Sequence, residues 1–165
     1  MLAMQYLQEI EKGDKSHFYL FLKNWPDTDD FPQLYNEEER DLLKGSPILK
    51  KLDRIEEKFV EDYDFLVKHI PEIGRFSYLQ FKKAMLLCSS RNFGVNIDGN
   101  STNVMVPLSD MLNHAQPYQA TWTYSNGRGG FLMTAEMDIK KDEEIFDSYG
   151  KKSSYTFLLH YAFIF

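Results

Sequence analysis

Two short segments of the sequence hold the side chains best suited to chemistry. Residues 110–114 are Asp-Met-Leu-Asn-His, and residues 147–150 are Asp-Ser-Tyr-Gly. Asn, His and Tyr each need hydrogen-bond partners when they are buried, so they are costly choices for a hydrophobic core. Taken singly, an Asn-His pair is more often a satisfied turn than a ligand site, and a Tyr before Gly often only ends a strand. Two such clusters in the same β-rich half of the chain favour a built site.

Other candidate motifs favour structural roles. Residues 126–130, Asn-Gly-Arg-Gly-Gly, lie between two expected strands, where no helix N-terminus would face a phosphate. Cys88 is expected on an apolar helix face, which is typical of a small buried hydrophobe rather than a nucleophile. The four histidines lack zinc-ligand spacing, so we expect no metal site: His17, His69, His114 and His160.

Length and composition set limits on the class of protein. A chain of 165 residues with 13 Phe and 10 Tyr can bury a dense core. Its net charge of −6 argues against nucleic acid as the main partner, because phosphate binding needs a basic face. A single cysteine indicates a reducing compartment, and we find neither a secretory signal nor an apolar run long enough to span a membrane. We therefore expect a cytoplasmic or nuclear protein.

Residues 1–90 have the pattern of an all-helical region. Ser46-Pro47 predicts a helix start, and Ser77 with Gln80 predicts a capping box at a second helix. Shorter helices are expected over 1–12, 16–23 and 36–44. The long helix after Pro47 carries one apolar stripe at steps of three and four residues: Ile48, Leu52, Ile55, Phe59, Tyr63, Leu66 and Ile70.

The pattern changes near residue 90. Residues 103–108, 118–125, 130–137 and 143–148 are short and mostly rich in β-branched and aromatic side chains, which predicts strands. Residues 153–161 predict a final helix. The fold class expected from both halves together is α+β.

Two longer stretches around the polar clusters carry a family resemblance. Residues 106–114, Val-Pro-Leu-Ser-Asp-Met-Leu-Asn-His, resemble the first signature of SET-domain protein methyltransferases, and residues 139–150 resemble the second. The likeness is to the subclass of Rubisco large-subunit lysine methyltransferase and the actin-histidine methyltransferase, which carries a helical insertion. By this resemblance, residues 1–90 are the insertion and residues 91–165 the C-terminal half of a SET core with a knot-like crossing.

The resemblance implies a cofactor site for S-adenosylmethionine. Asn113 and His114 would hold the cofactor through side-chain and backbone hydrogen bonds. Arg91 would pair with the cofactor carboxylate, for which a planar guanidinium is well suited. Asp110 would either contact the cofactor or brace the turn, and the sequence favours neither.

The resemblance also implies a catalytic and a substrate-binding residue. Tyr149 would be the catalytic tyrosine, also contacting the cofactor, and would orient a neutral amine for attack on the methyl group. Phe93 lies two positions after Arg91, where lysine-modifying members carry an aromatic side chain, so it favours a lysine substrate by cation–π contact. A core role for Phe93 stays open.

The implied activity is methyl transfer to a lysine of a non-histone protein. The Gly-rich segment and the C-terminal substrate-binding domain of the subclass are not found in this sequence, so we expect a piece of a longer protein or a reduced relative. A SET core without its first strands would have unpaired sheet edges, which favour self-association. The alternative function is a non-catalytic SET-like interaction module with an incomplete cofactor site.

Overall fold

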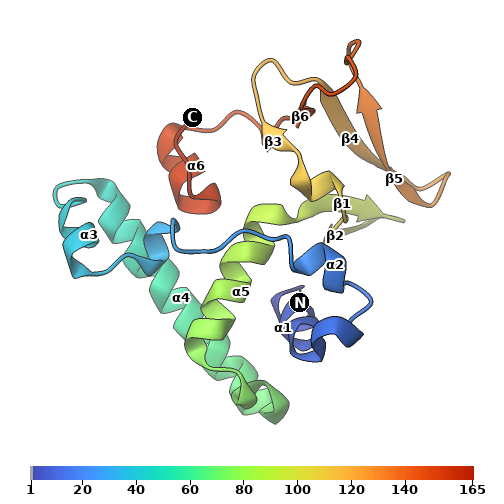
Figure 1. Cartoon of the computed structure of the whole chain (residues 1–165). Helices are drawn as coiled ribbons and strands as arrows, with labels where there is room; N and C mark the ends of the chain where they lie inside the picture. Colours follow the sequence, from blue (N-terminus) through green and yellow to red (C-terminus); the bar gives the residue numbers. More distant parts are fainter. Residues whose placement is uncertain (1) are drawn as a thin grey trace. The chain divides into compact units, whose positions relative to one another are not determined.

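The computed structural model describes residues 2–165, which form two compact units. The first unit runs to Ser90 and includes Ser153–Phe165, and the second is Arg91–Lys152. Among the described residues, the first unit contains the α-helices and the second contains the strands (Figure 1). The six helices of the described residues are α1 (Leu2–Lys12), α2 (Tyr19–Leu22), α3 (Glu37–Asp41), α4 (Pro47–His69), α5 (Tyr78–Arg91) and α6 (Ser154–Tyr161).

The two long helices begin where the sequence predicts. The Ser46 side chain accepts a hydrogen bond from the Ile48 amide and caps α4, which satisfies one of the amides that a helix start leaves without a partner. At α5, the Ser77 amide donates to Gln80 Oε1 at 2.8 Å, and the Gln80 amide donates to Ser77 Oγ. Both predicted starts are confirmed.

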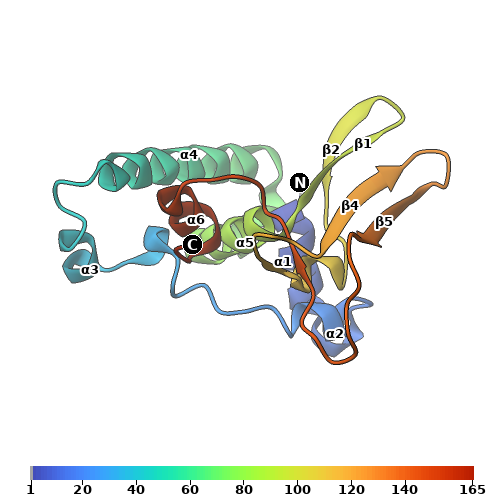
Figure 2. The ribbon, with the colours of Figure 1, turned by 90° about the horizontal axis from the view of Figure 1, so that it is seen from above.

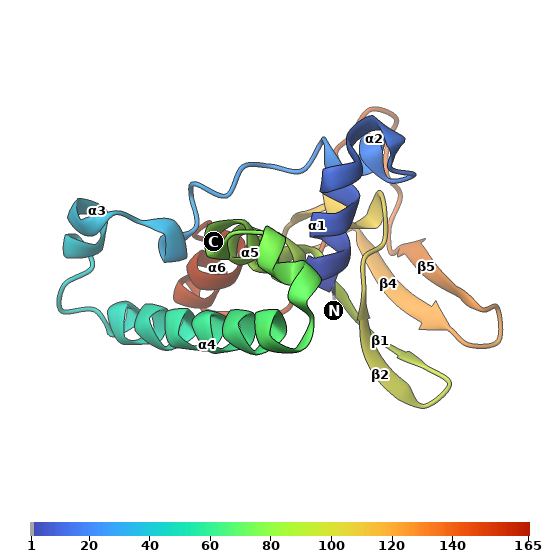
Figure 3. The ribbon, with the colours of Figure 1, turned by 90° about the horizontal axis from the view of Figure 1, so that it is seen from below.

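Helices α4 and α5 lie against each other (Figure 3) and are joined by apolar and polar contacts. The Tyr63 ring of α4 lies 5.4 Å from the ring of Phe81 in α5, and the Tyr63 hydroxyl donates to the Phe76 carbonyl. Lys82 of α5 forms an ion pair with Glu56 of α4 at 2.5 Å. Tyr63, which belongs to the apolar stripe of α4, therefore faces α5.

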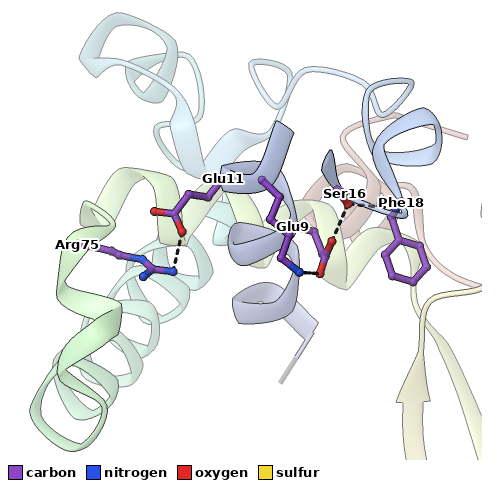
Figure 4. A network of polar contacts seen from close by, with 6 residues as sticks. Glu9, Glu11, Ser16, Phe18 and Arg75 are labelled. Carbon is purple, nitrogen blue, oxygen red and sulfur yellow. Dashed lines mark hydrogen bonds and ion pairs between the residues drawn. The ribbon is translucent and has the colours of Figure 1, made fainter. Parts of the chain in front are cut away.

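Polar contacts tie the first helix to its neighbours (Figure 4). The Ser16 hydroxyl donates to Glu9 of α1 at 2.6 Å and accepts from the Phe18 amide. Arg75 pairs with Glu11 of α1 at 2.6 Å. These bonds fix the turn after α1 and connect α1 to the turn before α5.

Two of the shorter helices are shorter than expected, and Met1 lies outside the described residues. The prediction for 16–23 contains only α2, because Ser16 and Phe18 start turns with i to i+3 bonds to Tyr19 and Phe21. The prediction for 36–44 contains only α3, after which the Leu43 amide also makes an i to i+3 bond. Such bonds form tight turns that do not extend as α-helix.

The second unit contains three two-stranded sheets, and Figure 2 shows the two that are hairpins. Antiparallel hairpins pair β1 (Phe93–Ile97) with β2 (Asn100–Val104) and β4 (Ala120–Ser125) with β5 (Gly130–Ala135). The third sheet is parallel and joins β3 (Asn113–His114) to β6 (Phe146–Asp147). The predicted strands at 118–125 and 130–137 are confirmed, and the one at 143–148 shortens to β6.

The prediction of a strand over 103–108 is largely wrong. The strand β2 ends at Val104, and β1 was not predicted. The two strands are joined by Asp98 and Gly99, both with positive φ, at +49° and +85°. This is the backbone of a two-residue hairpin turn, for which Asp-Gly is a favoured sequence. The Asp-Gly pair was the available signal for this hairpin.

The final helix is confirmed, and it belongs to the helical unit. Ser153 caps α6 by accepting from the Thr156 amide. In the same unit, Gln33 Nε2 donates to the Leu159 carbonyl of α6 at 2.8 Å. The compact units thus divide at residues 90 and 152, and the assignment of residues 1–90 and 91–165 to an insertion and a core stays a prediction. Among the described residues, no helix is both long and apolar enough to cross a bilayer.

Candidate functional site

The two polar segments of the sequence meet in the parallel pair β3–β6. Asn113 pairs with Phe146 and His114 pairs with Asp147 in the strand register. The Ala115 amide extends the pairing by donating to the Asp147 carbonyl at 3.1 Å. Segments far apart in the sequence thus lie side by side, as the family resemblance implies.

Tyr149 contacts the first segment at three points. Its amide donates to His114 Nδ1 at 3.1 Å, and its hydroxyl donates to the Leu112 carbonyl at 2.7 Å. Its ring stacks on the His114 imidazole with centroids 5.3 Å apart. Because Nδ1 accepts a hydrogen bond, the neutral imidazole carries its proton on Nε2. These contacts hold the phenol in one orientation beside β3.

His114 is buried, with 8% of its surface exposed. Desolvation by burial lowers the pKa of His114, the positive charge of Lys152 lowers it further, and a hydrogen bond with the Asp147 backbone opposes both. Burial disfavours the charged imidazolium, which keeps the ring neutral near pH 7. A neutral ring can keep accepting the Tyr149 amide.

Asn113 is held by a residue that the sequence analysis did not single out. The side chain of Asn113 is exposed, and its Nδ2 donates to Glu144 Oε1 at 2.6 Å. This bond identifies Nδ2 as the donor and fixes the orientation of the amide, so that Oδ1 is the acceptor. In the sequence, Glu144 lies within the predicted strand 143–148 and within residues 139–150, which resemble the second SET signature.

Arg91, the last residue of α5, forms an ion pair with Asp110, which precedes β3 in the chain. Arg91 Nη1 donates to the Asp110 carboxylate at 3.1 Å and to the Asp110 backbone carbonyl at 3.0 Å. The Asp110 side chain is fully buried, whereas that of Arg91 is 19% exposed. Asp110 lies in the short helical turn η4 (Ser109–Met111). Of the two roles left open for Asp110, this geometry favours bracing the turn and orienting Arg91.

Phe93 belongs to a cluster of three aromatic rings on the two hairpins. Its centroid lies 4.9 Å from that of Phe131 and 5.2 Å from that of Trp122, both in edge-on geometry. The side chains of Trp122 and Phe131 stack on each other at 5.5 Å. Phe93 is buried, so the ring packs as part of a core in this unit. The five other predicted site residues lie together along β3, β6 and the segments beside them.

The sequence matches the SET domain family over residues 4–150, which is most of the chain. The chain belongs to the SET domain family. The resemblance carried by residues 106–114 and 139–150 is therefore confirmed.

Curated relatives are similar over nearly the whole chain. A ribosomal lysine N-methyltransferase, set10, of Schizosaccharomyces pombe is 26% identical over 161 residues, covering 94% of this chain and 29% of the relative. The N-lysine methyltransferase setd6 of Danio rerio is 27% identical, covering 90% of this chain and 36% of the relative. The actin-histidine N-methyltransferase of Xenopus tropicalis is 25% identical, covering 94% and 28%. This SET-domain chain spans about a third of the length of these relatives.

Solved structures of the same fold include the SET domain of LSMT bound to methyllysine and AdoHcy. It superposes with a TM-score of 0.79 at 21% identity, covering 98% of this chain and 39% of that one. A structure of Rubisco LSMT bound to AdoMet superposes with a TM-score of 0.77 at 20% identity, covering 99% and 38%. At this identity the likeness establishes the fold, and it confirms the α+β class expected from the sequence.

Proposed function

We propose that this chain is part of an S-adenosylmethionine-dependent protein methyltransferase that acts on a lysine side chain of a non-histone protein. The observation that carries the proposal is the β3–β6 pairing, which places Asn113, His114 and Tyr149 together. The names of the relatives support a lysine target, since two of the three described above are lysine methyltransferases. We also propose a cytoplasmic or nuclear location.

The residues of the second unit suit the chemical groups of the proposed cofactor. A cationic guanidinium, that of Arg91, would pair with the carboxylate of S-adenosylmethionine, and the buried Asp110 orients that guanidinium. The Asn113 and His114 segment would supply hydrogen bonds to the polar groups of the cofactor, with Glu144 fixing the Asn113 amide. The bound cofactor supplies an electrophilic methyl group on a sulfonium, so the protein has only to align and desolvate the nucleophile.

Tyr149 is the proposed catalytic residue. Its hydroxyl group donates a hydrogen bond to the Leu112 carbonyl, so the phenol oxygen can act only as an acceptor toward a ligand. An acceptor at this point would hold an N–H of the target amine and turn the nitrogen lone pair toward the methyl carbon. A fixed approach of this kind is what an in-line displacement needs.

The test of the proposed function uses the whole chain and two measurements. Calorimetric titration with S-adenosylmethionine measures cofactor binding, and transfer of a radiolabelled methyl group to a pooled library of peptides with a central lysine measures activity. We expect Tyr149→Phe to lower transfer about 100-fold or more, because the amine loses its orientation. Cofactor affinity should change less than about threefold.

Tyr124→Phe is the matched control, because it removes a tyrosine hydroxyl from β4 in the same unit. This variant should keep wild-type transfer. Wild-type turnover by Tyr149→Phe would remove Tyr149 from the mechanism. Absence of both cofactor binding and transfer in the wild-type chain would reject the proposed function.

Phe93 as a wall of the lysine site stays a prediction beside its packing role. We expect Phe93→Leu to lower stability in either case, because it opens the cluster with Trp122 and Phe131. A rise in the KM for the lysine peptide, with kcat maintained, would indicate contact with the substrate. An unchanged KM would restrict Phe93 to packing.

We further propose that the protein self-associates through a strand edge. Among residues 2–165, β2 pairs with β1 alone, and its residues from Asn100 to Asn103 are exposed and uncharged. Such an edge offers backbone groups to another strand. Sedimentation at increasing concentration should show dimers of the wild-type chain, and Thr102→Lys should shift the population to monomers.

A further inference from the structure

Asp147 is one of the two buried carboxylates of the second unit. The residue is 2% exposed, and within the described residues its Oδ1 atom has no hydrogen-bond partner. Asp110, the other buried carboxylate of this unit, has a cationic partner in Arg91. A buried carboxylate oxygen without a donor is unfavourable unless the protein gains from it elsewhere. Asp147 has no such cationic partner among the described residues, so its burial calls for a functional explanation.

The strand register places Asp147 on the same face of the sheet as His114. Asp147 in β6 is the register partner of His114 in β3, and partners in a parallel pair project to the same face. The His114 ring stacks on the Tyr149 ring. The carboxylate thus belongs to the face formed by the catalytic tyrosine and the neutral histidine.

Among the described residues, no positively charged group pairs with the Asp147 carboxylate, which leaves that role to a cationic ligand. Burial raises the pKa of Asp147 to about 6, so the group is mostly ionised at pH 7 yet close to its titration range. The ionisable groups that the strand register and the chain place near it are His114 on β3 and, after β6, Tyr149 and Lys152. None of the described residues forms an ion pair with Asp147.

We infer that Asp147 receives the target ammonium group and takes its proton before methyl transfer. This inference rests on the proposed function and adds the group that binds the lysine as a cation. In the proton transfer, an N–H bond of the ammonium breaks, an O–H bond forms on Asp147, and the electron pair stays on nitrogen. The neutral amine is then the nucleophile, and Asp147 releases the proton to water after the transfer.

The chemistry of the reaction favours such a group. A lysine ammonium has a pKa of about 10.4, so only a small fraction is neutral at pH 7 and able to attack. A carboxylate that titrates near the working pH is suited both to holding the cation and to accepting its proton. The carboxylate gains a donor for its buried oxygen when the ammonium is bound, which removes the cost of its burial.

The kinetic test compares Asp147→Asn with Asp138→Asn. The first variant keeps the shape of the side chain but cannot take a proton, and the second makes the same change at an exposed position of the same unit. With the central-lysine peptide library as substrate, we expect Asp147→Asn to lower kcat/KM about 100-fold at pH 7. The loss should shrink steadily toward pH 10, where the amine loses its proton unaided, while wild type and Asp138→Asn vary little above pH 7.

A binding measurement provides a second readout that does not depend on turnover. Fluorescence polarisation, in the presence of S-adenosylhomocysteine, compares peptides with lysine or the uncharged norleucine at the central position. Wild type and Asp138→Asn should bind the lysine peptides about 10-fold more tightly at pH 7, and Asp147→Asn should lose this preference. A residue that only shaped the fold would weaken both peptides equally.

The outcomes separate this inference from the proposed function. If wild type transfers methyl groups and Asp147→Asn matches its rate, pH profile and lysine preference, the role of Asp147 is rejected and the methyltransferase function stands. If the wild-type chain neither binds S-adenosylmethionine nor transfers a methyl group, both are rejected. If Asp147→Asn has a low rate that does not recover at high pH and keeps its preference for the lysine peptide, the role of Asp147 is also overturned.

Discussion

The helical and strand units differ in whether each buried charged side chain has a partner of opposite charge. In the helical unit, the buried Lys82 is paired with Glu56, which also accepts from the Tyr78 hydroxyl at 2.8 Å. In the strand unit, two carboxylates are buried, and only Asp110 has a cationic partner. Asp147 is buried with an oxygen that has no partner among the described residues. The helical unit therefore satisfies its charge internally, whereas the strand unit retains one that suits a ligand.

The difference extends to how each unit gains its stability. The main apolar core is helical and is formed by Ala3, Met4, Leu7, Leu66, Ile73, Phe76, Phe81, Ala84 and Cys88. Burial raises the pKa of the Cys88 thiol to about 12, which keeps it protonated and inert, as the sequence predicts. The strand unit has only short strands. Some of its buried positions hold polar side chains, where apolar side chains would give the unit more stability. Such an exchange of stability for a site is typical of functional regions.

The largest effect on stability is expected from breaking the buried pair of the strand unit. Asp110→Asn leaves the Arg91 charge without its buried counterion, which should lower the free energy of unfolding by about 3 kcal/mol. The matched change in the helical unit is Asp53→Asn, which breaks an exposed pair with Arg40. This second change should cost less than about 1 kcal/mol. Urea denaturation of both variants measures the difference.

Equal losses in the two variants would contradict the comparison between the units. They would mean that solvent screens the Arg91–Asp110 pair as well as it screens the exposed pair. A cofactor titration of Asp110→Asn adds a check on orientation. Weaker binding of S-adenosylmethionine is expected, because the guanidinium is no longer held.

A smaller effect, of opposite sign, is expected at Asp147. Its pKa rises from 3.8 to about 6 on folding, so folding favours the protonated acid, and stability is lost as the pH rises through this range. This rise in pKa corresponds to a loss of roughly 3 kcal/mol in the free energy of unfolding at pH values above 6. We expect Asp147→Asn to be more stable than wild type by about 2 kcal/mol at pH 7.5, because Asn is itself a buried polar group.

The pH dependence of this gain is its control. Near pH 4 the wild-type acid is protonated, and the two proteins should have similar free energies of unfolding. His114 acts in the other direction, since its lowered pKa makes wild type and variant alike lose stability as the pH falls below 6.5. The difference between the two proteins at each pH cancels that contribution. A variant less stable than wild type at pH 7.5 would show that Asp147 makes favourable contacts in the folded chain.

The two units also differ in how far the sequence predicts them. The starts of α4, α5 and α6 depend on Ser46, Ser77 and Ser153, whose caps act within a few residues of the chain. Local patterns of this kind are visible in the sequence. Where turns compete with helix at similar energy, as after Asp41, the sequence pattern predicted too long an element.

The site could be predicted in part. The pairing of Asn113 and His114 with the Tyr149 segment followed from polar residues in a β-rich context together with the family resemblance. The partner of Arg91 and the isolation of the Asp147 carboxylate could not be predicted. Both depend on which side chains meet across the fold, and neither spacing nor residue type determines that.

The smallest effect sharpens the comparison from the helical side. Ser46→Ala removes the acceptor for the Ile48 amide at the start of α4, which should lower the free energy of unfolding by about 1 kcal/mol. The matched control is Ser101→Ala, at an exposed position of β2, with an expected change below about 0.5 kcal/mol. Cofactor affinity should be unchanged in both, because neither residue belongs to the proposed site. A loss of cofactor affinity in Ser46→Ala at full folding would show that the helical unit contributes to binding, and the contrast between a stabilising unit and a functional one would then be wrong.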